Sequence, residues 1–160
     1  MFGIGLFYVG ITLFMNGCSI LYKWDLKAVG IFNIIVGSLS TLIQVTSMLR
    51  GDYYSAGTGF LFGFTYLFLG ISFYKGLDLK PYGLFSLFVT INTLLFSYLT
   101  FQSGDPFFGV MWLIWGMLWL TSFIENNLGI NLGKFTAYFI LFCGVFTTWL
   151  PGLYLIISGQ

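Results

Sequence analysis

Six long apolar stretches separated by short polar breaks dominate this sequence. They run approximately over residues 2–22, 28–49, 56–74, 82–101, 107–124 and 135–157. Each has about the 20 residues that an α-helix needs to cross a hydrocarbon core roughly 30 Å thick. Because nearly every charged residue falls in a break, the pattern predicts an all-α integral membrane protein with six transmembrane helices, forming one domain over residues 1–160.

The composition agrees with this prediction. Of the residues, 58% are hydrophobic and 7% are charged, against roughly 45 to 50% and about 25% in soluble domains. The first stretch lacks a preceding Lys or Arg and a following A-x-A site, so we expect a retained helix and not a signal peptide. A net charge of +1 gives no basic patch, so membrane lipids and not nucleic acid are the expected surroundings.

Several kinds of chemistry are missing from the sequence. It contains no histidine, the commonest general base and metal ligand. Cys18 and Cys143 lie in apolar stretches without metal-site spacing, and a disulfide framework is not expected. With no nucleophile paired to a base, we expect neither an enzyme nor a bound metal or cofactor.

Basic residues are unevenly divided between the loops. Arg50 is the only basic residue in the second and fourth loops. The first, third and fifth loops contain five: Lys23, Lys27, Lys75, Lys80 and Lys134. Cytoplasmic loops of membrane proteins carry the excess of Lys and Arg. This distribution predicts odd-numbered loops in the cytoplasm and both termini outside.

An internal repeat is also indicated. The letters D-L-K around Asp25 recur around Asp78, 53 residues later, and a further 53 residues lead to Asn131. Three repeated helical hairpins, each turning at the cytoplasmic side, would place six helices around a channel along the membrane normal. We predict this arrangement.

Side chains in the predicted helices favour passage of an uncharged solute. Trp112, Trp115 and Trp119 share one face of the fifth helix, and Phe62 and Tyr66 are i, i+4 neighbours on the third. A stripe on the first helix consists of Leu6, Val9, Leu13 and Asn16. Together these residues would form a narrow, flat slot whose indole N–H and amide groups bind a solute oxygen. The alternative is ordinary helix packing.

Other intramembrane residues keep two interpretations. For Asn33 and Asn92, interhelical hydrogen bonding is the alternative to a role in the path. Gly59 with Gly63, and Gly109 with Gly116, form small-residue pairs. These glycines would pack helices within one subunit or between subunits.

Five segments resemble one known family. They are LFYVGITLFMNG (6–17), TGFLFGFTYL (58–67), SLFVTINT (86–93), WLIWGMLWLTSFIEN (112–126) and LGKFT (132–136). The sequence is similar to the AmiS/UreI urea channels and amide transporters, which are encoded beside bacterial ureases and amidases. The resemblance implies three hairpins per subunit, hexameric rings with one channel in each subunit, and a bacterial inner-membrane location.

The same resemblance implies a set of residues along the path. Carried over by motif, these are Leu6, Val9, Leu13, Asn16, Phe62, Tyr66, Trp112, Trp115, Leu118 and Trp119. The expected function is a passive urea channel that supplies a cytoplasmic urease. The alternatives are a channel for short-chain amides beside an amidase, and a membrane scaffold that transports nothing.

Two departures from the acid-gated channel of this family bear on gating. The position of an acidic residue in that relative's sixth helix aligns with Cys143 here. The relative's long outer loops with histidine are replaced by short loops whose carboxylates are Asp52 and Asp105. Because an aspartate ordinarily titrates at about 3.9, we expect a channel that acid does not open.

Overall fold

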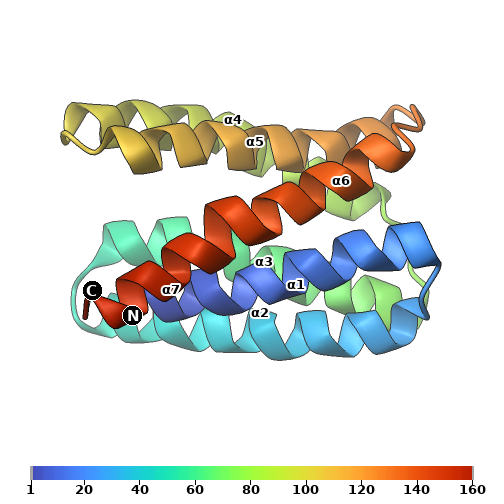
Figure 1. Ribbon diagram of the computed structural model, residues 1–160, viewed down its shortest axis with the longest axis horizontal. Coiled ribbons are helices and arrows are strands. Elements are labelled where there is room, and N and C mark those ends of the chain that lie inside the picture. Colours follow the sequence, from blue (N-terminus) through green and yellow to red (C-terminus); the bar gives the residue numbers. More distant parts are fainter. Residues whose placement is uncertain (1, 160) are drawn as a thin grey trace.

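The computed structural model describes residues 2–159 as a bundle of six long helices (Figure 1). The first five are α1 (Phe2–Tyr22), α2 (Leu26–Leu49), α3 (Tyr53–Lys75), α4 (Lys80–Gln102) and α5 (Pro106–Asn127). The sixth is continuous and consists of α6 (Lys134–Phe142), the π-helical segment η1 (Cys143–Trp149) and α7 (Leu150–Ile157). All six are long and apolar enough to cross a membrane, which confirms the predicted all-helical class.

Aspartates set the beginnings of three helices. The Asp25 carboxylate accepts the backbone N–H of Lys27 at 2.8 Å, so α2 begins at Leu26, before the predicted residue 28. Asp52 accepts the N–H of Ser55 at 3.0 Å in the same way, and α3 begins at Tyr53. Asp105 caps α5. Because the first N–H groups of a helix have no partner within it, a capping carboxylate extends the helix into the polar break.

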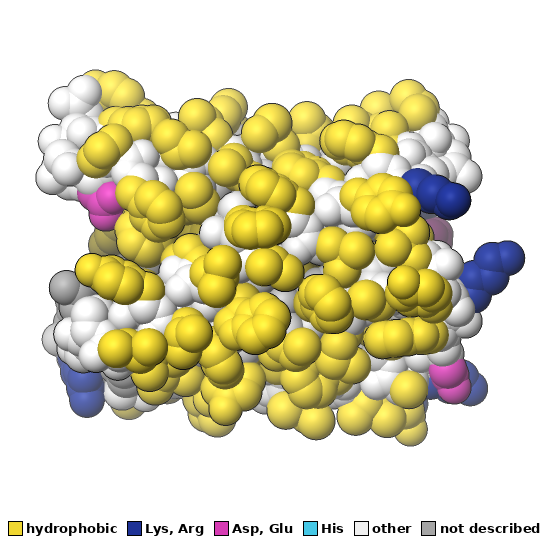
Figure 2. Space-filling view, viewed as in Figure 1, with side chains coloured by type: hydrophobic (Ala, Val, Ile, Leu, Met, Phe, Trp, Pro, Cys, Tyr) yellow, Lys and Arg dark blue, Asp and Glu magenta, His cyan; other side chains and the backbone are white. Residues whose placement is uncertain are grey.

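Charged groups gather at the two ends of the bundle. Figure 2 shows an apolar belt around the middle, with the Lys, Arg, Asp and Glu side chains at either end. The three loops with lysines lie at one end of the bundle, which we call the lysine end. The loops containing Arg50 and Asp105 lie at the other end, which we call the arginine end. Both ends of the helical chain lie there too (Figure 1).

The helices that pack most closely are not the predicted hairpins. The most extensive packing joins α2 with α3, α4 with α5, and α1 with the whole sixth helix. The predicted hairpins instead paired the first helix with the second, the third with the fourth, and the fifth with the sixth. The hairpin repeat therefore stays a sequence prediction, and the packing units of the bundle are the other three pairs.

Glycines allow these pairs to approach closely. A Cβ atom at Gly10 of α1 would lie 2.6 Å from the backbone nitrogen of Trp149. Gly63 and Gly116, at successive intervals of 53 residues, meet Thr41 of α2 and Thr93 of α4. Both predicted glycine pairs face helices of their own chain, which favours packing within one subunit.

The π-helical segment was not predicted, and it ends two residues before Pro151. Proline has no N–H, and its ring clashes with the carbonyl four residues earlier in a regular α-helix. A wider turn before the proline accommodates it without ending the helix. In this segment the Thr148 hydroxyl donates to the carbonyls of Cys143 and Gly144 at 3.1 and 2.8 Å.

Close packing at Gly10 leads to the first prediction. Gly10→Ala places a methyl group against the backbone of η1. Because this overpacks the contact, we expect the free energy of unfolding to fall by about 1 to 3 kcal/mol. Gly57→Ala is the matched control because nothing lies within 4 Å of a Cβ there. Thermal unfolding in detergent measures both, and equal midpoints would contradict the proposed role of Gly10.

Candidate conduction path

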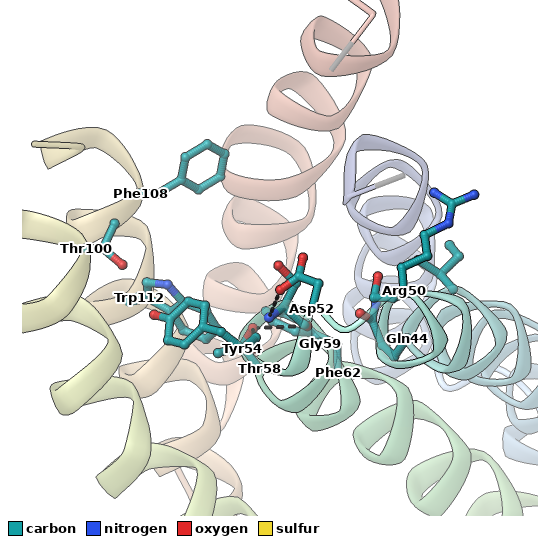
Figure 3. A pocket seen from close by; sticks show the side chains of 13 residues that line it. Gln44, Arg50, Asp52, Tyr54, Thr58, Gly59, Phe62, Thr100, Phe108 and Trp112 are labelled. Atoms are coloured by element: carbon teal, nitrogen blue, oxygen red, sulfur yellow. Dashed lines mark hydrogen bonds between the residues drawn. The ribbon is translucent and has the colours of Figure 1, made fainter. Parts of the chain in front are cut away.

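Two cavities enter the bundle from opposite ends. The arginine-end cavity, with a volume of about 400 Å³, lies among α2, α3, α4 and α5 beside Arg50 and Asp52 (Figure 3). The lysine-end cavity, of about 270 Å³, extends from Leu13 past Tyr66 to Glu125. The lining of the second cavity includes residues from all six long helices.

One phenylalanine lines both cavities. The centroid of the Phe62 ring lies 5.9 Å from that of the Trp112 ring, and Trp112 lines the arginine-end cavity. The Phe62 centroid also lies 5.1 Å from the centroids of the Trp115 and Trp119 rings, and these two residues line the lysine-end cavity. Phe62 and the three tryptophans, called here the aromatic cluster, therefore stand between the two cavities.

Hydrogen bonds fix two of the tryptophans. The Trp115 indole N–H donates to Thr147 Oγ1, and that of Trp119 donates to Thr65 Oγ1, both at 2.9 Å. The two threonine hydroxyls in turn donate to carbonyls of their own helices, at 2.7 and 2.6 Å. In this structure both indole N–H groups already have protein acceptors, so their binding to a solute, as expected from the sequence, stays a prediction.

The structure brings the predicted path residues together. Eight of them belong to one cluster of buried side chains: Leu6, Val9, Leu13, Phe62, Tyr66, Trp112, Trp115 and Trp119. Leu118 is partly buried against this cluster, and Asn16 lines the lysine-end cavity. The aliphatic stripe of α1 and the aromatic residues of α3 and α5 thus meet in the interior.

The three asparagines of the apolar stretches have different surroundings. Asn16 and Asn33 exchange two amide hydrogen bonds, of 3.1 and 2.8 Å, and thereby join α1 to α2. This confirms interhelical bonding for Asn33 and shows that much of the hydrogen-bonding capacity of Asn16 is used inside the protein. Asn92 donates instead to Phe88 O of its own helix, on the outer side of α4.

Several polar lining residues were missed by the sequence analysis. Gln44 and Thr58 line the arginine-end cavity, and Tyr82 and Glu125 line the other. Glu125 accepts the Thr136 hydroxyl at 2.9 Å and so ties α5 to α6 near the lysine end. Glu125 was assigned to a polar break, and only its place at the end of the tryptophan helix could have indicated a lining role.

Asp52 lies at the mouth of the arginine-end cavity (Figure 3). Its carboxylate accepts hydrogen bonds from Ser55, and these favour the ionised form. The pKa of Asp52 is consequently below the usual value for an aspartate.

A bundle of membrane-spanning helices with a cavity at each end has the architecture of a membrane transport protein. The chain belongs to the AmiS/UreI family of transporters, whose family model matches residues 1–159. The resemblance drawn from the sequence motifs is thereby confirmed.

Individual relatives agree over nearly the whole chain. The acid-activated urea channel of Helicobacter pylori is 38% identical, with 99% of this chain and 98% of the relative covered. AmiS2 of Rhodococcus erythropolis, named a "Putative transporter protein", is also 38% identical, covering 100% and 81%. The cryo-electron microscopy structure of the H. pylori channel in its closed state matches with a TM-score of 0.95 and 39% identity over the full length of both chains.

Proposed function

We propose that this protein is a passive membrane channel for urea. The observation that carries the proposal is the pair of cavities that share Phe62 of the aromatic cluster, in a chain that is 38% identical to a urea channel over nearly its whole length. Short-chain amides are the second candidate solutes. A Mycolicibacterium smegmatis relative named a "Putative amidate substrates transporter protein", 37% identical, favours them.

The proposed path suits a small, flat, neutral molecule. A solute that leaves water must find new hydrogen-bond partners or flat surfaces, because an unsatisfied buried amide costs several kcal/mol. The rings of Phe62, Trp115 and Trp119 supply such surfaces, while Leu6, Val9 and Leu13 are proposed to form the opposite, aliphatic wall. An ion between the aromatic cluster and this aliphatic wall would meet no opposite charge among the residues of either. The proposed metabolic partner is a cytoplasmic urease or amidase that consumes the solute.

Flux measurements test the function and the path together. Proteoliposomes should take up urea faster than empty liposomes, and uptake at the empty-liposome rate for urea and acetamide would exclude a channel and leave a scaffold. Trp119→Ala should change urea permeability or selectivity several-fold more than Trp149→Ala, because only Trp119 belongs to the aromatic cluster. Similar effects of the two substitutions would make Trp119 an ordinary packing residue.

We further propose that acid does not open this channel. The alignment with the acid-activated H. pylori channel runs over 193 positions, whereas this chain has 160 residues and no histidine, so segments of that relative have no counterpart here. The α2–α3 and α4–α5 loops at the arginine end are short, and the lowered pKa of Asp52 keeps its carboxylate ionised at pH 5.

The corresponding prediction concerns pH. Urea flux into proteoliposomes should stay constant within about twofold between pH 7.5 and 5, since an aspartate with a lowered pKa does not change charge in that interval. Asp52→Asn should leave this profile flat. A steep rise in flux on acidification, at constant protein amount, would show that other groups gate the channel.

We propose an inner-membrane orientation with the lysine end in the cytoplasm and both termini outside. The support is the excess of lysines at that end. A cysteine introduced at the exposed Ser103 should react with an impermeant thiol reagent from outside, and one at the exposed Leu77 should not. The reverse labelling pattern would overturn the orientation. The proposed hexamer rests on family resemblance, and a monomeric mass in mild detergent, with urea flux retained, would contradict it.

A further inference from the structure

Gln44 of α2 presents a carboxamide to the arginine-end cavity (Figure 3). The residue is 8% exposed, and among the described residues none forms a hydrogen bond with its side chain. A buried polar group without a partner destabilises the protein unless water or a solute satisfies it. The amide of Gln44 is therefore available to a molecule inside the cavity.

The neighbouring glycine explains how Gln44 reaches this place. A Cβ atom at Gly59 of α3 would collide with the Cδ, Oε1 and Nε2 atoms of Gln44, so the carboxamide lies directly over Gly59. The positions 53 residues before and after Gly59 are Leu6 and Trp112, both buried in the central cluster. Position 59 has no side chain of its own, and Gln44 occupies the space.

The surroundings of Gln44 complete a small recognition site. Thr58 lines the same cavity, and its hydroxyl already donates to Tyr54 O at 2.9 Å, which leaves its oxygen free to accept. Phe62 and Trp112 supply aromatic surface beside it. Donor, acceptor and flat apolar surface are thus found together immediately before the aromatic cluster.

We infer that Gln44 is a specificity-determining residue that recognises the amide edge of the solute at the arginine-end entrance to the aromatic cluster. This inference rests on the proposed function. A carboxamide has a C=O acceptor beside an N–H donor, and urea and primary amides present the complementary edge. Two hydrogen bonds to Gln44 would replace water as the solute leaves the cavity. A solute without that edge would lose its hydrogen bonds to water and gain none from Gln44 in return.

The first experiment compares two identical substitutions in proteoliposomes. Gln44→Met removes the carboxamide and keeps a flexible side chain, and Gln102→Met makes the same change at an exposed residue. We expect Gln44→Met to lower urea permeability about fivefold, as the loss of one or two neutral hydrogen bonds implies. Permeability to ethylene glycol, which lacks an amide edge, should change far less, and Gln102→Met should match the wild type.

The second experiment displaces the carboxamide without removing it. Gly59→Ala pushes aside the flexible end of Gln44, so folding should be retained while urea permeability falls. In a Gln44→Met background the same substitution should have little further effect, because the two changes act on one group. Gly59→Ala also tests the inference if Gln44→Met fails to fold.

The outcomes separate this inference from the proposed function. A wild-type protein that conducts neither urea nor acetamide would refute the function, and the inference with it. Wild-type conduction combined with unchanged urea selectivity in Gln44→Met or in Gly59→Ala would refute the role of Gln44 alone. Fully additive effects of the two substitutions would also refute it.

Discussion

Helices in this bundle hold together by close contact of their backbones. Lipid tails are as apolar as leucine side chains, so helix association inside a membrane depends on packing and hydrogen bonds and gains little from the hydrophobic effect. Gly37 lies against the backbone of Leu67, and Gly144 lies against that of Gly10. Such contacts join α2 with α3 and α1 with the sixth helix, and in the third tightly packed pair Gly116 of α5 lies against the Thr93 side chain of α4. The space among the pairs is where the aromatic cluster and both cavities lie.

One kind of buried hydrogen bond links each pair to the next. The Asn16–Asn33 amides join α1 to α2, Trp119 and Thr65 join α5 to α3, and Trp115 and Thr147 join α5 to η1. Each such bond is worth about 0.6 to 2 kcal/mol in a membrane. Each of the three junctions between pairs therefore has a side-chain bond where backbone packing is looser. The same bonds orient two of the tryptophans that separate the cavities.

The sequence was most informative where one helix alone decides the outcome. Span lengths follow from apolar runs, and the inward face of α5 follows from the spacing of Trp112, Trp115 and Trp119. Helix partners could not be predicted, because these helices are apolar on nearly every side and hydropathy does not mark the face that packs. Gln44 was missed for the same reason: its position depends on Gly59 of a neighbouring helix. The π-helical turn depends on how one proline is accommodated.

In the path proposed here, the position of Phe62 has a consequence for transport kinetics. Two chambers with one shared wall behave as resistances in series, so the total rate is set by the step past that wall and depends little on the width of either chamber. Enlarging a chamber would change how many molecules wait there and hence the concentration at which flux saturates. Altering the shared wall would change the maximal rate. Evolution could therefore adjust affinity for the solute and speed of passage at separate positions of one small protein.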